Sequence, residues 1–249
     1  MADDRTAGVP WRRIAIEFLI IVAGVMVALA TDRWAVSLEN QRKEHAHLEQ
    51  LRADFQDNEL IAKGAAGYKE SLGASASAVL EAIMDTPRMH RDVPFPVDVE
   101  LAGWNHAAHY LSEAWQDLLS TGDVRLIRNA DLKREIARFY QRSAAARQYE
   151  DEWRSYVMAY RASVTHVLDP YLRLKILQLF PERMLVADSL GVRDSDQAIT
   201  GRLRALPEVP GKLTDAIMAH RAGAHRYNED IEVIQRIIAL LDREIGADR

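Results

Sequence analysis

The sequence predicts an all-α protein in which one N-terminal transmembrane helix continues into a membrane-attached helical bundle. An apolar run lies near the start of the chain, and apolar residues recur at helical spacing through most of the remaining sequence. We therefore expect three parts: a short arm over residues 1–13, a span with its interfacial flank over 14–34, and a helical-bundle domain over 35–249.

The apolar run extends from Ile14 to Ala30, and its only charged side chain is Glu17. As a helix it rises about 25 Å, slightly less than a hydrocarbon core of about 30 Å. Trp11 and Trp34 flank the run, and indole rings favour the headgroup level, so the flanks supply the missing thickness. This pattern predicts a single membrane span.

Arg12 and Arg13 at the start of the run favour a cytoplasmic N-terminus and an exported C-terminal domain. The alternative is a cleaved signal peptide, because Ala28-Leu29-Ala30 fits the small-x-small cleavage pattern. Glu17 is unusual in the core of a signal peptide, and Trp34 is typical of an interfacial anchor, so we favour the span.

The polar sequence after Trp34 contains no helix breaker, so we expect the span to run directly into a long helix. Leu48, Leu51 and Phe55 give this helix one apolar face. We expect the helix to loosen at its glycines and to end before the proline-containing loop from Asp85 to Asp98; these glycines are Gly64, Gly67 and Gly73.

A second helix is predicted from Leu101 to Leu119, with apolar residues on one face and Gly122 as its C-terminal stop. Asn129 or Asp131 is expected to cap the next helix. That helix carries an aromatic row at spacings of four, three and four: Tyr149, Trp153, Tyr156 and Tyr160.

Asp169-Pro170 interrupts this pattern and precedes a short apolar helix. The most regular periodicity is C-terminal, between Leu213 and Ile245, where apolar residues alternate steps of three and four. Additional apolar residues at Val233 and Ile237 widen the stripe beyond a two-stranded coiled-coil seam. The last helix is therefore expected to pack inside a bundle.

Two blocks of the sequence carry a family resemblance. In Arg13–Trp34, a glutamate begins an apolar span that ends in a short polar turn and a tryptophan; in Trp115–Tyr140, a serine-glycine turn is followed by Leu-Ile-x-Asn and a helix with a tyrosine. The chain thereby resembles a bacterial domain-of-unknown-function family of small single-pass membrane proteins with a C-terminal helical domain. Ile16, Ala35 and Val36 depart from the family pattern. The resemblance implies an inner-membrane location and no known activity, ligand or catalytic residue.

Composition narrows the functional classes. The chain has 249 residues, a formal net charge of −5 and no cysteine, so neither a basic nucleic-acid footprint nor thiolate chemistry is expected. No phosphate loop, zinc-protease motif or dinucleotide fingerprint occurs, and Ser120-Thr121-Gly122-Asp123 is typical of a turn rather than of a nucleophile with its base. We expect no catalytic residue and no cofactor.

The aromatic residues are the candidate ligand or partner surface. Tyr149, Trp153, Tyr156 and Tyr160 would form one wall, and Trp104 and Trp115 the opposite wall. The alternative is core packing, since an aromatic row at helical spacing is typical of a bundle interior.

His106 and His109 have a spacing that places two imidazoles on one helix face. No third ligand is spaced suitably, so a metal site is not predicted.

Three residues of the span are candidates for pairing. Gly24 and Ala28 form a small-xxx-small pattern that lets two spans approach closely. Glu17 either pairs with a partner or handles protons, or it reaches the interface beside Arg13.

These observations predict a non-enzymatic interaction or scaffold protein of the cell envelope, whose partners are the lipid bilayer and another membrane protein or a second copy. The alternative function is an extracytoplasmic small-molecule sensing domain that acts through a separate partner, because aromatic rows in a bundle can line a cleft.

Overall fold

The computed structural model describes residues 11–86, 93–179 and 190–247. Within these ranges the chain forms helices and irregular connections and no strand, which confirms the all-α prediction. The elements are α1 (Trp11–Ile83), α2 (Phe95–Leu101), α3 (Glu113–Thr121), the 3-10 turn η1 (Asp123–Arg125), α4 (Ala130–Ser163), α5 (Pro170–Leu179), α7 (Asp196–Arg204) and α8 (Val209–Ala247).

Helix α1 is a single helix of 73 residues, so the predicted continuation beyond Trp34 is confirmed. The expected loosening at its glycines is wrong, since Gly64, Gly67 and Gly73 all lie inside it. At Gly73 a Cβ atom would lie 3.3 Å from Cβ of His220, so α8 packs closely against the helix here. Tertiary packing along one face stabilises a helix more than the propensity of single residues does.

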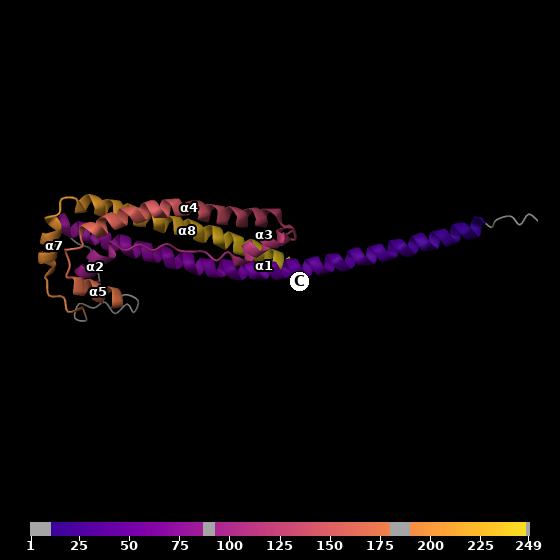
Figure 1. Cartoon of the computed structure of the whole chain (residues 1–249), viewed down its shortest axis with the longest axis horizontal. Coiled ribbons are helices and arrows are strands. Elements are labelled where there is room, and N and C mark those ends of the chain that lie inside the picture. The colour runs from indigo at the N-terminus through magenta and orange to yellow at the C-terminus, as the bar shows by residue number, and fades with distance from the viewer. Residues whose placement is uncertain (1–10, 87–92, 180–189, 248–249) are drawn as a thin grey trace, which may run out of the picture.

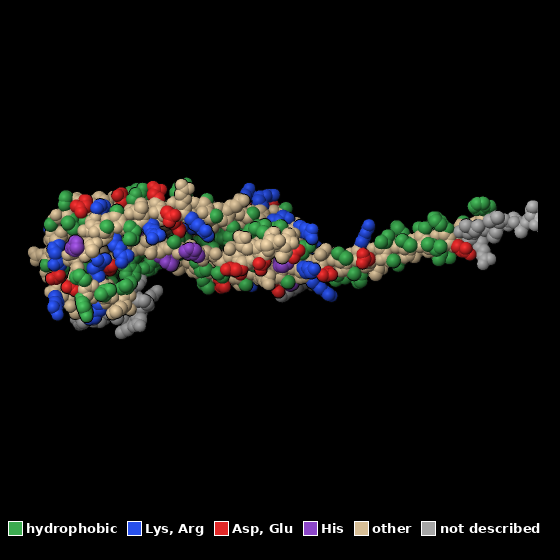
Figure 2. Space-filling model, viewed as in Figure 1, with side chains coloured by type: hydrophobic (Ala, Val, Ile, Leu, Met, Phe, Trp, Pro, Cys, Tyr) green, Lys and Arg blue, Asp and Glu red, His purple; other side chains and the backbone are tan. Residues whose placement is uncertain are grey.

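The N-terminal part of α1 projects beyond the bundle as a lone helix (Figure 1). Residues 15–37 are all exposed, and apolar side chains cover the projecting helix (Figure 2). An 18-residue window in this part has a mean hydropathy of 2.1, and none of it is buried. The described part of the chain thus has one helix long and apolar enough to cross a membrane, which is compatible with an anchor.

The rest of α1 forms a bundle with α4 and α8 (Figure 1). Residues late in α8 contact residues early in the bundled part of α1, as in the ion pair of Arg52 with Asp242, so the two helices are antiparallel. The core nearest the projecting helix includes the predicted apolar face of α1; its residues include Leu48, Leu51, Phe55, Ile136, Phe139, Ile234 and Leu241.

Several predicted helix ends are confirmed. Gly122 adopts φ of 76° after α3, a left-handed conformation that glycine reaches without strain. The side chain of Asn129 accepts hydrogen bonds from the backbone of Asp131 and Leu132 and so caps α4. Residues 87–92 of the predicted proline-containing loop lie outside the described residues. The predicted end of this loop at Asp98 is wrong, because α2 already begins at Phe95.

The predicted helix from Leu101 to Leu119 is wrong over residues 102–112, and only its C-terminal part is helical. Helix α2 ends at Leu101 and α3 begins at Glu113, and residues 104–112 between them form an irregular segment that we call the strap. Gly103 precedes the strap and lies so close to α4 that a Cβ atom would be 3.0 Å from Cβ of Arg161. A helix over 101–119 is absent because side chains of the bundle bind the strap's backbone.

Candidate functional site: the strap and the charges beneath it

Buried side chains hold the backbone of the strap. The amide of Asn58 donates to the carbonyl of Leu111 at 2.9 Å, and the N–H of Leu111 donates to the Asn58 side chain at 2.7 Å. The hydroxyl of Tyr140 also donates to the Leu111 carbonyl at 2.9 Å, and the N–H of Ala108 donates to the hydroxyl of Tyr227 at 2.9 Å. These bonds replace those that a helix would make with itself.

A network of charged side chains links the strap to α4 and α8. The carboxylate of Asp230 is 3% exposed, and it accepts from Arg142 at 2.6 Å and from the hydroxyl of Tyr110 at 2.9 Å. Arg226 lies between this carboxylate and that of Glu150 and forms an ion pair with each. The pairing compensates much of the cost of removing these charges from water.

Lys69 crosses the interface between α1 and α8. Its side chain passes Gly223, where a Cβ atom would lie 3.2 Å from the lysine Cδ and Cε atoms. The ammonium donates to the side-chain oxygen of Asn105 in the strap at 2.6 Å. Burial lowers the pKa of Lys69 to about 8, although the nearby Glu150 carboxylate opposes the shift.

His220 of α8 is completely buried, and neither ring nitrogen has a hydrogen-bond partner within the described ranges. Burial, assisted by the ammonium of Lys69, lowers the pKa of His220 to about 4, against a smaller opposing effect of the Ala102 backbone. The imidazole is therefore neutral in the folded protein at pH 7.

The stability of the fold should fall as the pH decreases from 6.5 to 4. In this range His220 becomes protonated in the unfolded chain but stays neutral in the folded chain. The free energy of unfolding therefore decreases as the pH falls below 6.5, and the shift in the pKa of His220 corresponds to a loss of about 3 kcal/mol. Lys69 is protonated in both the folded and the unfolded state over this range, so it does not contribute to the change of the free energy of unfolding with pH. Urea unfolding of the full chain at several pH values measures the effect.

His220→Leu should remove the contribution of His220 to the slope of the free energy of unfolding against pH. His225→Gln is the matched control, because His225 lies on the same helix with an exposed side chain and should leave the slope unchanged. Equal slopes for His220→Leu and the wild type would show that His220 is not the group responsible.

The six aromatic residues predicted to form two walls do not face one another across a cavity. Along α4, Tyr149 and Tyr156 are exposed, Trp153 is half-buried, and Tyr160 is completely buried with its hydroxyl donating to the carbonyl of Val99 at 3.0 Å. The buried residues in this half of α4 are Ala146, Val157 and Tyr160, so only one member of the aromatic row is fully buried.

Trp104 and Trp115, the predicted opposite wall, also lie apart. Trp104 packs in a cluster with Leu101, whereas Trp115 packs in the separate core around Phe55. The two tryptophans therefore belong to different hydrophobic clusters and do not form one wall.

His106 and His109 lie in the strap rather than on a helix, so the helical spacing proposed for them does not exist. The ring of His106 meets that of Tyr68 edge-on at 5.5 Å. No group of three or more His, Asp or Glu side chains that could hold a metal occurs among the described residues.

The three candidate pairing residues of the span all lie on the projecting part of α1. Glu17, Gly24 and Ala28 are exposed, and apart from the adjacent residues and backbone of the same helix no atom lies within 4 Å of the position that a Cβ of Gly24 would take. The face that carries Gly24 is therefore open to a neighbouring helix.

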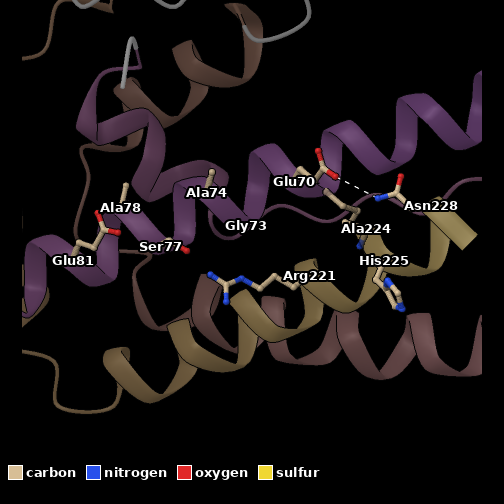
Figure 3. A pocket seen from close by; sticks show the side chains of 11 residues that line it. Glu70, Gly73, Ala74, Ser77, Ala78, Glu81, Arg221, Ala224, His225 and Asn228 are labelled. Atoms are coloured by element: carbon tan, nitrogen blue, oxygen red, sulfur yellow. Dashed lines mark hydrogen bonds between the residues drawn. The ribbon is translucent and has the colours of Figure 1, made fainter. Parts of the chain in front are cut away.

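A groove and a small cavity indent the bundle surface. The groove, about 550 Å³, runs between α1 and α8 above small residues such as Gly73 and Ala224, and the hydrogen bond from Asn228 to Glu70 crosses one end (Figure 3). The cavity, about 140 Å³, lies between the strap, α3, α4 and α8; its lining is Ala108, His109, Tyr110, Ser112, Gln116, Tyr140, Ser143, Ala144, Arg147, Glu150 and Arg226.

Neither hollow includes any of the six predicted aromatic residues. Sequence analysis did not identify the polar groups of the bundle interior and of the small cavity as functional candidates; these are Asn58, Lys69, Arg147, Glu150, Arg226 and Asp230.

Comparison of the chain with protein-family models, with curated proteins and with solved structures gave no match. The family resemblance therefore rests on the two sequence blocks alone.

Proposed function

We propose that the projecting part of α1 anchors this protein in the bacterial inner membrane, with the arm in the cytoplasm and the bundle outside. The observation that supports this most directly is the completely exposed apolar window of α1. Its exposed residues are large, including Phe18, Leu19, Ile20 and Ile21, and such a surface is unfavourable in water but not in hydrocarbon.

The anchored bundle acts as a non-enzymatic interaction or scaffold protein of the envelope. Helix α1 has no break between the span and the bundle, so the bundle stands on a continuous support. Burial of α1 begins at Glu44, and the remaining stretch to Ile83 extends roughly 60 Å farther at about 1.5 Å per residue. The continuous helix holds the bundle at a fixed distance from the membrane, and confinement to the membrane plane raises the effective concentration of partners that are anchored in the same membrane.

Single-cysteine labelling tests the topology, because the natural chain has no cysteine to interfere. In spheroplasts, a membrane-impermeant maleimide should label Ser71→Cys, which lies on the exposed face of α1, and should label Ala2→Cys only after lysis. The reverse pattern would overturn the orientation. A mature chain that starts after Ala30 and is recovered in the soluble fraction would overturn the anchor.

Purification of the tagged full chain in mild detergent, followed by intact-complex mass measurement, tests the interaction role. A stoichiometric partner or a homo-oligomer is expected, and a lone monomer would contradict the proposal. If a homo-oligomer forms through the span, Gly24→Ile should dissociate it by blocking close helix approach, whereas the neighbouring Val25→Ile should not.

A further inference from the structure

We propose that the small cavity beside the strap binds a small oxyanion, either a carboxylate or an inorganic anion of the phosphate or sulfate type. The proposal goes beyond the partner-binding role and does not depend on it. Four parts of the fold meet at this cavity, namely the strap, α3, α4 and α8, and its volume of about 140 Å³ equals the space of roughly five water molecules.

The charged lining favours an anion. Arg147 and Arg226 line the cavity, and Glu150 is the one carboxylate in its lining. Glu150 already accepts hydrogen bonds from Arg226 and from the hydroxyl of Tyr227, so its negative charge is engaged. Arg147 is an exposed residue of α4 without an ion pair or hydrogen bond to another described residue, and its guanidinium can form two parallel bonds to an oxyanion.

The uncharged lining supplies further hydrogen-bond donors. Ser143 from α4, Gln116 from α3 and His109 from the strap border the cavity, and within the described ranges none of these side chains bonds to another residue. A hydroxyl, an amide and an imidazole can each donate to an oxyanion. Donors from separate elements therefore surround a space in which Arg226 is paired with Glu150 and Asp230, and Arg147 supplies the positive charge available to an anion.

The hydrogen bonds that hold the strap also fix one wall of the cavity. This wall depends on the position of residues 108–112, which Asn58, Tyr140 and Tyr227 hold through the backbone. Donors whose positions are fixed before binding lose less freedom when a ligand arrives, which increases affinity.

Isothermal titration calorimetry on the full chain in phosphatidylcholine nanodiscs tests the proposal at constant ionic strength. Phosphate, sulfate, acetate and succinate are titrated separately, so that the anion that binds most tightly shows whether the site prefers an inorganic oxyanion or a carboxylate. At least one should bind saturably, with a dissociation constant below about 10 mM. Absence of saturable binding by all four would overturn the proposal.

Two pairs of variants locate the site. Arg147→Gln should weaken binding by about tenfold or more, whereas Arg138→Gln, an exposed arginine of the same helix outside the cavity, should not. Ala144→Leu should block binding by filling the cavity without a change of charge, while Ala145→Leu, equally exposed on α4 but outside the cavity lining, should bind normally. Binding that survives both Arg147→Gln and Ala144→Leu would place the anion elsewhere and overturn the assignment.

Discussion

Replacement of Asp230 by alanine is expected to lower the free energy of unfolding by roughly 3 to 5 kcal/mol. Asp230 is 3% exposed and is bonded to Arg142 and Tyr110, with Arg226 also in ion-pair range. Its removal leaves the half-buried guanidinium of Arg226 with one carboxylate instead of two and leaves the Tyr110 hydroxyl without its acceptor. The cost is large because the remaining groups stay out of water.

Urea unfolding of the full chain, followed by circular dichroism, measures this loss. Glu229→Ala is the matched control, because Glu229 is the preceding acidic residue, is exposed and pairs with His225 on the surface. It should change stability by less than about 0.5 kcal/mol. Similar losses for the two variants would show that the buried network contributes no more than a surface pair.

The long helices could be predicted because their apolar periodicity reflects burial on one side. Leu48, Leu51 and Phe55 of α1 are buried as their spacing indicates, and so are Leu213 and Leu241 of α8. In both helices the pattern extends over many turns, so an isolated polar residue or glycine does not obscure it. The glycines of α1 misled the prediction because propensity is local, whereas support from α8 is not.

The strap could not be predicted because the groups that hold it are distant in sequence. Its residues have the spacing of an amphipathic helix, yet Asn58 and Tyr227 bind its backbone from α1 and α8. A periodicity argument sees only neighbours along the chain. This error removed the basis for pairing His106 with His109 and for placing Trp104 opposite the aromatic row.

The buried polar residues are visible in the sequence in one way, as polar residues at core positions of an apolar repeat. Asn58 follows Phe55 by three residues, and His220 lies between Ile217 and Ala224 in the C-terminal repeat. Each position is buried. The signal identifies such residues as unusual but does not give their partners, since Arg142 and Asp230 come from helices that meet only in the folded bundle.

Replacement of Asn58 by alanine is expected to cost roughly 3 to 4 kcal/mol in the free energy of unfolding. Asn58 is completely buried and makes two bonds to the backbone of Leu111. The Leu111 carbonyl keeps the Tyr140 hydroxyl as a donor, but the Leu111 N–H loses its acceptor, and the missing side chain leaves a cavity. The strap should therefore detach locally before the bundle unfolds.

Hydrogen exchange separates these two effects. In Asn58→Ala the amides of Ala108 and Leu111 should exchange faster by a larger factor than the amides of α8 that contact α1, because the former depend directly on the strap. Asn228→Ala is the matched control, since Asn228 is exposed and its contact with Glu70 is 3.5 Å long. Uniform acceleration across the strap and α8 would mean that the strap cannot open alone and that it forms one cooperative unit with the bundle.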